Sequence, residues 1–262
     1  MKLLVFLISA ISWYSAHSQI VFPDNKKALI ILTYDDALNS QLDNALPELD
    51  KAGLKATFFL NQFRSVDQID RWKKASENGH ELANHSVFHP CQSHVYPADP
   101  RYQAENYTVS TMIREISVMN QLLYAIDHKA KHTYAYPCGV VIAGSKSYVD
   151  SLSKCGFVTY ARTVGSNPII KDLNKLDPFQ VPCQAYNAPP DGLELISFIK
   201  QVVDEKAMAV LIFHGVRGDY LQVSNVAHRQ MLEYLKSNSK DIWVTTFEKG
   251  MEFDMKAEGI HR

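Results

Sequence analysis

The sequence of 262 residues lacks several features that would place it in a special class of proteins. Its formal net charge of −1 provides no basic surface for nucleic acid or for an anionic membrane. Beyond residue 18 it has no run of about 20 apolar residues that could span a membrane. We find no linker and no low-complexity segment that would divide it into domains. What remains is a globular chain, 46% hydrophobic, that is long enough for one large core.

Cysteine is also scarce, and the chain has four: Cys91, Cys138, Cys155 and Cys183. No CxxC pair occurs among them, which argues against a cysteine zinc ribbon. Four cysteines can form two disulfides in three ways, and sequence alone does not choose among these.

The N-terminus has the pattern of a signal peptide over residues 1–18. Lys2 supplies the positive charge, and the apolar residues 3–13 are too few to span a membrane. Residues 16–18 (AHS) resemble a cleavage site of the small-x-small type. We therefore expect residues 19–262 to form one mature domain that is exported to the periplasm or the extracellular space. Such a compartment permits disulfides.

The chain does contain apolar, strand-like runs that alternate with amphipathic stretches. Alternation of this kind predicts parallel βα units. About seven units suit a single barrel-like domain, somewhat short of eight full repeats. We expect strands at residues 28–32, 55–60, 81–84, 133–136, 157–161, 207–213 and 242–247, and helices at residues 39–51, 66–78, 108–126, 147–154, 192–205 and 224–236.

Four of the expected strands end in residues that can carry chemistry. Parallel α/β proteins gather their reactive groups where strands end. Each group alone is more often a solvated turn or a structural residue. Their common placement at one end of the strands favours a functional site. The residues are Asp35 and Asp36 after the first strand, His85 and His89 after the third, residues 137–139 (PCG) after the strand at 133–136, and His214 after the strand at 207–213.

A carboxylate with two histidines is a set that binds one divalent metal ion. It suits Zn²⁺ and leaves a position open for water, with Co²⁺, Ni²⁺ or Mn²⁺ as alternatives. The spacing of His85 and His89 predicts that both face one way on a single helical turn, which Pro90 ends.

Four short motifs resemble those of the polysaccharide deacetylases, the NodB-homology group or carbohydrate esterase family 4. Residues 33–37 (TYDDA) resemble the first motif, TFDDG, and residues 85–89 (HSVFH) resemble H-[ST]-x-x-H. Residues 135–139 (AYPCG) resemble RxPxG, and residues 212–214 (IFH) resemble LxH. The motifs occur in family order. The resemblance implies a distorted (β/α)7 barrel of the NodB-homology type, with residues 19–262 as the catalytic domain.

The resemblance also implies an activity and a role for each residue. The protein would be an exported, metal-dependent hydrolase that removes N- or O-linked acetyl groups from an acetylated polysaccharide or oligosaccharide. Asp35 would act as general base on water activated by the metal, and His214 as general acid. The backbone N–H of Cys138 would donate to the oxyanion. The metal ligands would be Asp36, His85 and His89.

The sequence departs from the family pattern at the residue that pairs with the base. The third motif usually begins with Arg, and Ala135 occupies that position. Arg162, at the end of the strand at 157–161, could reach inward instead, or it could be an ordinary surface residue. The Asp–Trp motif that often follows this strand is absent, and its role stays unassigned.

Two further expectations concern the loops around the site. Cys91 lies two residues after His89, and Cys138 lies in the third motif, so a disulfide between them is favoured over a role as zinc ligands. Sugars stack on aromatic rings, and we expect substrate contacts from Tyr136 and from Tyr96 in the long loop at residues 91–106.

Alternative functions remain open at this point. The chain could be a non-catalytic relative that binds glycan and metal, or a hydrolase of the same superfamily that acts on small non-peptide C–N bonds. A zinc peptidase is disfavoured because HExxH peptidases need Glu where Ser86 stands. The sequence defines neither the glycan nor the oligomeric state.

Overall fold

The computed structural model describes residues 20–63, 65–97 and 99–257. The predicted signal peptide lies outside these described residues. Within them, no helix combines the length and the apolar character that a membrane span requires.

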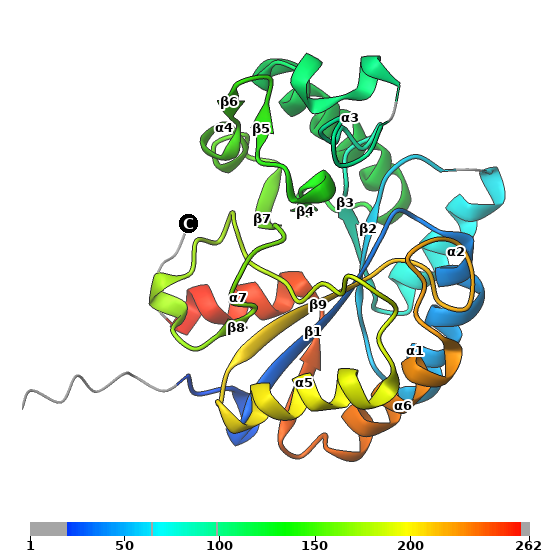
Figure 1. Cartoon of the computed structure of the whole chain (residues 1–262), viewed down its shortest axis with the longest axis vertical. Coiled ribbons are helices and arrows are strands. Elements are labelled where there is room, and N and C mark those ends of the chain that lie inside the picture. Colours follow the sequence, from blue (N-terminus) through cyan, green and yellow to red (C-terminus); the bar gives the residue numbers. More distant parts are fainter. Residues whose placement is uncertain (1–19, 64, 98, 258–262) are drawn as a thin grey trace, which may run out of the picture.

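An eight-stranded sheet curls into a distorted barrel with helices around it (Figure 1). Neighbouring strands pair in parallel, apart from β8, which is antiparallel to β9. Residues 181–184 bridge the two edges, because Val181 pairs with Arg162 and Gln184 pairs with Leu211. The strand order is β7 (Val158–Arg162), β4 (His132–Ala135), β3 (Glu81–Asn84), β2 (Thr57–Leu60), β1 (Ala28–Asp35), β9 (Met208–Phe213) and β8 (Ile169–Ile170), and β10 (Ile242–Thr245) pairs with the first half of β1.

The helices begin where the sequence supplies caps. Side-chain oxygens of Thr108, Asp191 and Ser224 accept the backbone N–H three residues on, which satisfies one free donor at each helix start. The helices are α1 (Leu46–Ala52), α2 (Val66–Glu77), α3 (Val109–Asp127), α4 (Val149–Ser153), α5 (Gly192–Asp204), α6 (Asn225–Ser237) and α7 (Phe247–Ala257). A π-helical turn (Gln41–Ala45) leads into α1, β5 (Ile142–Ala143) and β6 (Lys146–Ser147) form a hairpin, and 3₁₀ turns cover Pro23–Asn25, Pro100–Tyr102, Ala104–Asn106, Pro137–Gly139 and Leu173–Lys175.

The alternation of side chains along β1 sorts them between two cores. Ile30, Leu32 and Tyr34 belong to the cluster that packs against the helices. Leu29 and Ile31 belong to a second cluster, inside the barrel. Because side chains of a strand alternate between its faces, Asp35 points into the barrel while its neighbour Tyr34 points out.

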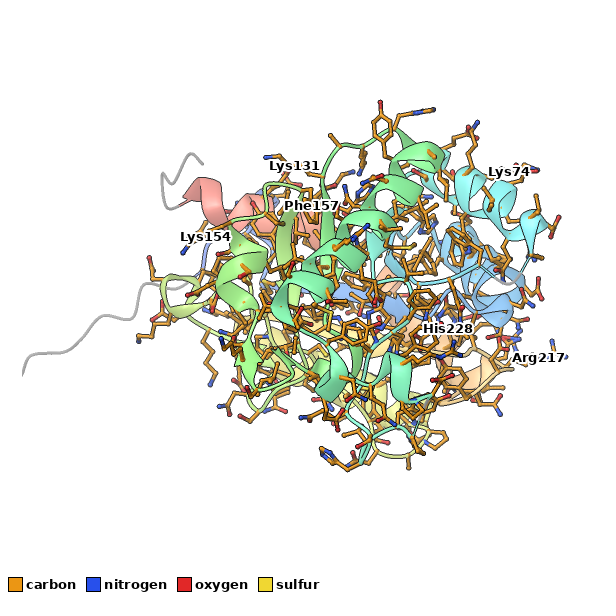
Figure 2. The ribbon with its side chains drawn as sticks, turned by 90° about the horizontal axis from the view of Figure 1, so that it is seen from above. Lys74, Lys131, Lys154, Phe157, Arg217 and His228 are labelled. Atoms are coloured by element: carbon orange, nitrogen blue, oxygen red, sulfur yellow. A yellow bond between two sulfur atoms is a disulfide. The ribbon has the colours of Figure 1, made fainter. Side chains whose placement is uncertain are left out.

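Tyr34 ties the end of β1 to two helices. Its hydroxyl lies 2.6 Å from Nε2 of His228 on α6, and Nδ1 of that histidine lies 2.6 Å from the Glu48 carboxylate on α1. Viewed from above, His228 lies within the molecule, whereas Lys74, Lys154 and Arg217 extend from its periphery (Figure 2). The strand that precedes the two aspartates is therefore fixed from its outer face.

Helix α7 replaces the end of the last predicted strand. The strand stops at Thr245, and Phe247 begins the helix. Phe247 and Met251 pack in the cluster inside the barrel. The backbone N–H of Glu248 donates to Glu81 Oε2 at 2.9 Å, which anchors the helix where β3 begins. Helix α7 thus closes the end of the barrel opposite the strand-end loops.

Candidate active site

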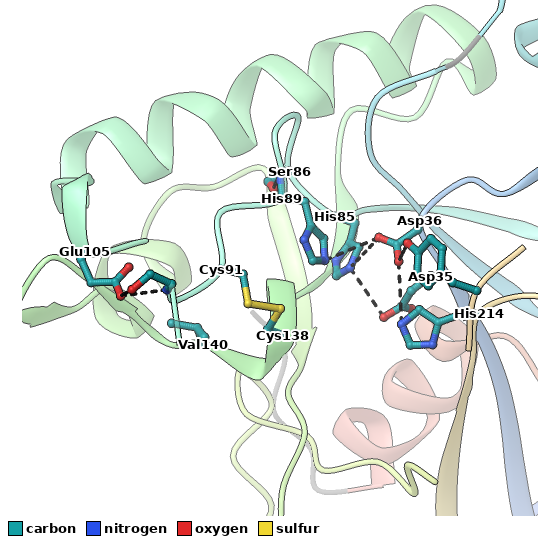
Figure 3. The surroundings of a disulfide bond; sticks show 12 residues. Asp35, Asp36, His85, Ser86, His89, Cys91, Glu105, Cys138, Val140 and His214 are labelled. Carbon is teal, nitrogen blue, oxygen red and sulfur yellow. Dashed lines mark hydrogen bonds and ion pairs between the residues drawn. A yellow bond between two sulfur atoms is a disulfide. The ribbon is translucent and has the colours of Figure 1, made fainter. Parts of the chain in front are cut away.

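Five of the predicted residues converge where β1, β3 and β9 end (Figure 3). Asp36 lies at the centre of the group. Its Oδ1 lies 3.6 Å from Nε2 of His85 and 3.5 Å from Nε2 of His89. Its Oδ2 lies 3.7 Å from Nε2 of His214. Asp35 lies on the inner side, with Oδ2 3.6 Å from the same nitrogen of His85.

Asp36, His85 and His89 have the geometry of a metal-binding set. Their ligand atoms all lie within 4.8 Å of one another. Two atoms each about 2.1 Å from a tetrahedral ion are about 3.4 Å apart, so a small adjustment suffices. Nδ1 of His85 donates to the carbonyl of Ala135 at 2.8 Å, which leaves Nε2 with its lone pair toward Asp36.

The charge states of His89 and Asp36 also suit a metal. Burial and the neighbouring His85 lower the pKa of His89 more than the two aspartates raise it, so its imidazole is neutral near pH 7. Burial raises the pKa of Asp36, but the three histidines and the Tyr220 hydroxyl outweigh burial and leave it lowered. A neutral imidazole and an ionised carboxylate are the forms that bind a divalent ion. The residues present therefore fit one such ion.

The segment between the two histidines is not the helical turn that the spacing predicted. Ser86 and His89 have φ angles of 58° and 53°, in the left-handed region. Asn84 Oδ1 accepts the Ser86 N–H at 2.9 Å, and Ser86 Oγ accepts the His89 N–H at 3.1 Å. Glu115 of α3 accepts the two N–H groups in between. This bonded loop still places the two imidazole rings 4.7 Å apart.

Asp35 has one paired and one unpaired oxygen. It is buried, and its Oδ2 accepts a hydrogen bond from the guanidinium of Arg162. Its Oδ1 is buried and has no hydrogen-bond partner among the described residues. A buried, unpartnered carboxylate oxygen next to a metal-binding set is suited to accept a proton from a water molecule.

Arg162 points into the barrel and contacts Asp35, so it is not an ordinary surface residue. In the sheet, Arg162 of β7 is the register partner of Ala135 of β4. The two side chains share one face at one level, and the methyl group of Ala135 leaves space for the guanidinium. Arg162 lies 5.0 Å over the ring of Phe59 and donates to Cys183 Sγ at 3.3 Å.

The Cys91–Cys138 disulfide is present, with Cα atoms 5.7 Å apart. It joins the loop after His89 to the turn at Pro137–Gly139 and lies beside the histidines (Figure 3). Both cysteines are consumed by this bond, so neither is a thiolate ligand. Cys155 and Cys183 are free thiols.

The two predicted substrate tyrosines have different environments. Tyr136 is buried, and its hydroxyl donates to the carbonyl of Phe179 at 2.9 Å. It faces outward because Ala135, its neighbour in the chain, faces the barrel. Tyr136 therefore has no ring face free for a sugar, which corrects that prediction. Tyr96 is 58% exposed, and its contact with substrate stays a prediction.

Three contributors to the site were not found from the sequence. Asn61, which follows β2, donates to Asp36 Oδ1 at 3.0 Å, and the strand-end rule applied to β2 could have found it. Gln41 Nε2 donates to the carbonyls of Asp35 and His214, at 2.5 and 3.1 Å. The Tyr220 hydroxyl donates to Asp36 Oδ2 across a separation of 184 positions, which no local pattern reveals.

Comparison with known proteins agrees with this geometry. A sequence profile described as polysaccharide deacetylase matches residues 23–160, more than half of the chain. The chain belongs to the polysaccharide deacetylase family. This confirms the family that the four motifs indicated. Among curated proteins, it is 42% identical over 55 residues to the uncharacterised protein YlxY of Bacillus subtilis. That match covers 21% of this chain and 17% of YlxY.

Solved structures of similar fold support the deacetylase architecture. A polysaccharide deacetylase described as putative, from Mycobacterium smegmatis, is 14% identical with a TM-score of 0.61, over 93% of this chain and 95% of that one. A family 4 acetyl xylan esterase from Clostridium thermocellum, in complex with a cobalt ion, is 16% identical with a TM-score of 0.57, over 89% and 93%. The catalytic domain of a peptidoglycan N-acetylglucosamine deacetylase from Eubacterium rectale is 18% identical with a TM-score of 0.55, over 88% and 93%. The predicted NodB-type barrel is confirmed.

Proposed function

We propose that this polysaccharide deacetylase is an exported, metal-dependent hydrolase that removes acetyl groups from a glycan. The main support is the division of labour between the two adjacent aspartates. Asp36 faces two histidines in a metal-binding set, while Asp35 keeps one buried oxygen that has no hydrogen-bond partner in the described part of the chain. The proposal that the protein is exported rests on the sequence of residues 1–18.

A divalent ion held by Asp36, His85 and His89, with Zn²⁺ as the expected metal, would acidify a water molecule and polarise the acetyl carbonyl. Oδ1 of Asp35 accepts the proton of the attacking water. The Arg162 guanidinium on Oδ2 fixes the orientation of that carboxylate and balances its charge.

Two groups complete the proposed reaction. His214 lies across from the other histidines, and its side chain is 22% exposed, so it can reach the substrate. It donates a proton to the departing amine or alcohol. The backbone N–H of Cys138, in the turn held by the disulfide, donates to the developing oxyanion. Tyr96 is proposed as an aromatic contact for the glycan.

The first experiment measures acetate release by purified, zinc-loaded protein. Acetylated xylan, chitin oligosaccharide and peptidoglycan are tested side by side, with a chelated control. We expect chelator-sensitive release from one of them, which would also identify the bond as an ester or an amide. Release that persists after the chelator has removed the metal would contradict metal dependence.

Two variants test the roles of the residues. Asp35→Asn should retain one metal per chain and lose about 10²- to 10⁴-fold in acetate release. His85→Ala should lose the metal. Metal analysis of both proteins distinguishes these effects, and loss of metal from Asp35→Asn would exchange the roles of the two aspartates.

A non-catalytic role is the second candidate. The missing Asp–Trp motif favours it, because no residue has been assigned to that role. A pseudoenzyme of the same esterase family also shares this fold, at 18% identity and a TM-score of 0.51, over 86% of this chain and 67% of that one. Metal bound at one per chain, with no acetate from any of the three substrates, would support a binding protein.

A further inference from the structure

We propose that Tyr220 is a positioning residue for the metal-binding set, a role that rests on the proposed metal site. Its hydroxyl donates to Oδ2 of Asp36 and thereby keeps Oδ1 facing His85 and His89. Tyr220 lies in the loop between β9 and α6, outside the four sequence motifs.

The two oxygens of Asp36 have separate sets of partners. Oδ1 faces the imidazoles of His85 and His89 and accepts the Asn61 amide. Oδ2 accepts the Tyr220 hydroxyl. A carboxylate can exchange its two oxygens by rotation about a single bond, and a donor on each oxygen restricts that rotation. A hydroxyl on the oxygen that does not face the histidines is the type of contact that orients metal ligands from the next layer.

The position of Asp36 at the end of β1 explains why its side chain needs such a restraint. Asp36 has a φ angle of 81°, in the left-handed region, which residues other than glycine adopt at a cost in conformational free energy. Asp36 directly follows β1, and its backbone N–H still donates to the Phe59 carbonyl of β2 at 3.0 Å, but this backbone bond does not fix the rotation of the side chain. Asn61 and Tyr220 supply that restraint from two other loops.

The loop that contains Tyr220 is itself tightly constrained. Gly215 N–H donates to the Tyr220 carbonyl at 3.2 Å, and Val223 N–H donates to the Gly215 carbonyl at 2.9 Å. A Cβ at position 215 would lie 2.0 Å from the carbonyl oxygen of Gly218, so only glycine fits there. Asp219 accepts the Ser40 N–H at 2.9 Å and ties this loop to the segment after β1. The loop that carries Tyr220 is therefore held in place by hydrogen bonds and by the tight turn at Gly215, and this fixes the position of the hydroxyl.

The oxygen of Asp36 that accepts the Tyr220 hydroxyl also faces the proposed general acid, His214. The Tyr220 hydroxyl occupies Oδ2, the same oxygen that lies 3.7 Å from His214. At that distance His214 makes no hydrogen bond to Asp36. The imidazole of His214 is therefore available to the substrate.

The test is Tyr220→Phe, which removes the hydroxyl and keeps the ring. The side chain is 48% exposed, so the substitution removes little packing. We expect the dissociation constant for Zn²⁺ or Co²⁺, measured by calorimetry or against a competing chelator, to rise about 10- to 100-fold. Tyr124→Phe, at an exposed tyrosine on α3, is the matched control and should leave the constant unchanged.

The outcomes separate this inference from the proposed activity. A Tyr220→Phe protein with the thermal stability and the metal affinity of the wild type would overturn the inference alone. Wild-type protein that binds one metal but releases no acetate would overturn the activity, while weakened metal binding in Tyr220→Phe would still support the inference. A wild type that binds no metal would overturn both.

Discussion

The guanidinium of Arg162 reaches Asp35 from β7. This strand lies next to β4, where the family's RxPxG motif would place its arginine at position 135. Ala135 and Arg162 are register partners, so the cation enters the barrel at the same level from either position. Both Arg162 and Asp35 are buried, and the ion pair between them is closed to solvent. A buried charge that loses its partner is strongly destabilising.

We predict that Arg162→Ala lowers the free energy of unfolding by about 3–5 kcal/mol and abolishes acetate release. The double variant Ala135→Arg/Arg162→Ala should recover part of both, because it returns the cation from the neighbouring strand. Urea denaturation and the acetate assay measure the two effects. A double variant no better than Arg162→Ala alone would show that the position on β7 is specifically required.

At the scale of elements, α7 depends on one buried carboxylate. Glu81 at the start of β3 accepts hydrogen bonds from the hydroxyls of Thr57 and Thr133 and from the first turn of α7. Burial, with Glu248 nearby, raises the pKa of Glu81 from 4.5 to about 7. The folded protein therefore binds a proton at this carboxyl more tightly than the unfolded chain does.

This raised pKa predicts a pH dependence of stability. The stabilising contribution of Glu81 is fully present below about pH 4.5 and is lost as the pH rises through about 7, with a total of up to about 3 kcal/mol. Urea denaturation from pH 5 to 8 measures it. Glu81→Gln, which cannot ionise, should remove this component of the slope. Identical pH profiles of the two proteins would contradict the raised pKa.

The regular elements were predictable from the sequence because buried faces impose a period on apolar residues. The long helix α3 and the strand β9 were found nearly to the residue. Helix α7 was missed because the apolar run into Phe247 suggested a longer strand. The loop from His85 to His89 was misread as helical, since its shape depends on Glu115, which lies outside the motif. Tertiary partners of this kind leave no local pattern.

At the scale of the whole molecule, the disulfide fastens two loops that are far apart in the chain. Cys91 and Cys138 are separated by 47 positions, and everything between them, including α3, forms one closed loop. Restricting the unfolded chain by such a link is worth about 4 kcal/mol in the chain-entropy description.

We predict that Cys91→Ser/Cys138→Ser lowers the free energy of unfolding by up to about 4 kcal/mol. Reductant should destabilise the wild type by a similar amount and leave the double variant unchanged. Thiol titration of unreduced, unfolded protein should find the two free cysteines, Cys155 and Cys183. Four titratable thiols would exclude the bond.

The contacts that shape the site also have a consequence for the order of folding. Asp35 meets Arg162 across 127 positions, and Asp36 meets Tyr220 across 184. Contacts so distant along the chain form only after the long intervening loops have closed, and that closure is slow. Strand β7, which carries Arg162, and strand β9, which precedes Tyr220, must therefore be in place before both aspartates have their final partners. Metal added during refolding should be captured in its final arrangement only in the last phase, after β9 has paired with β1.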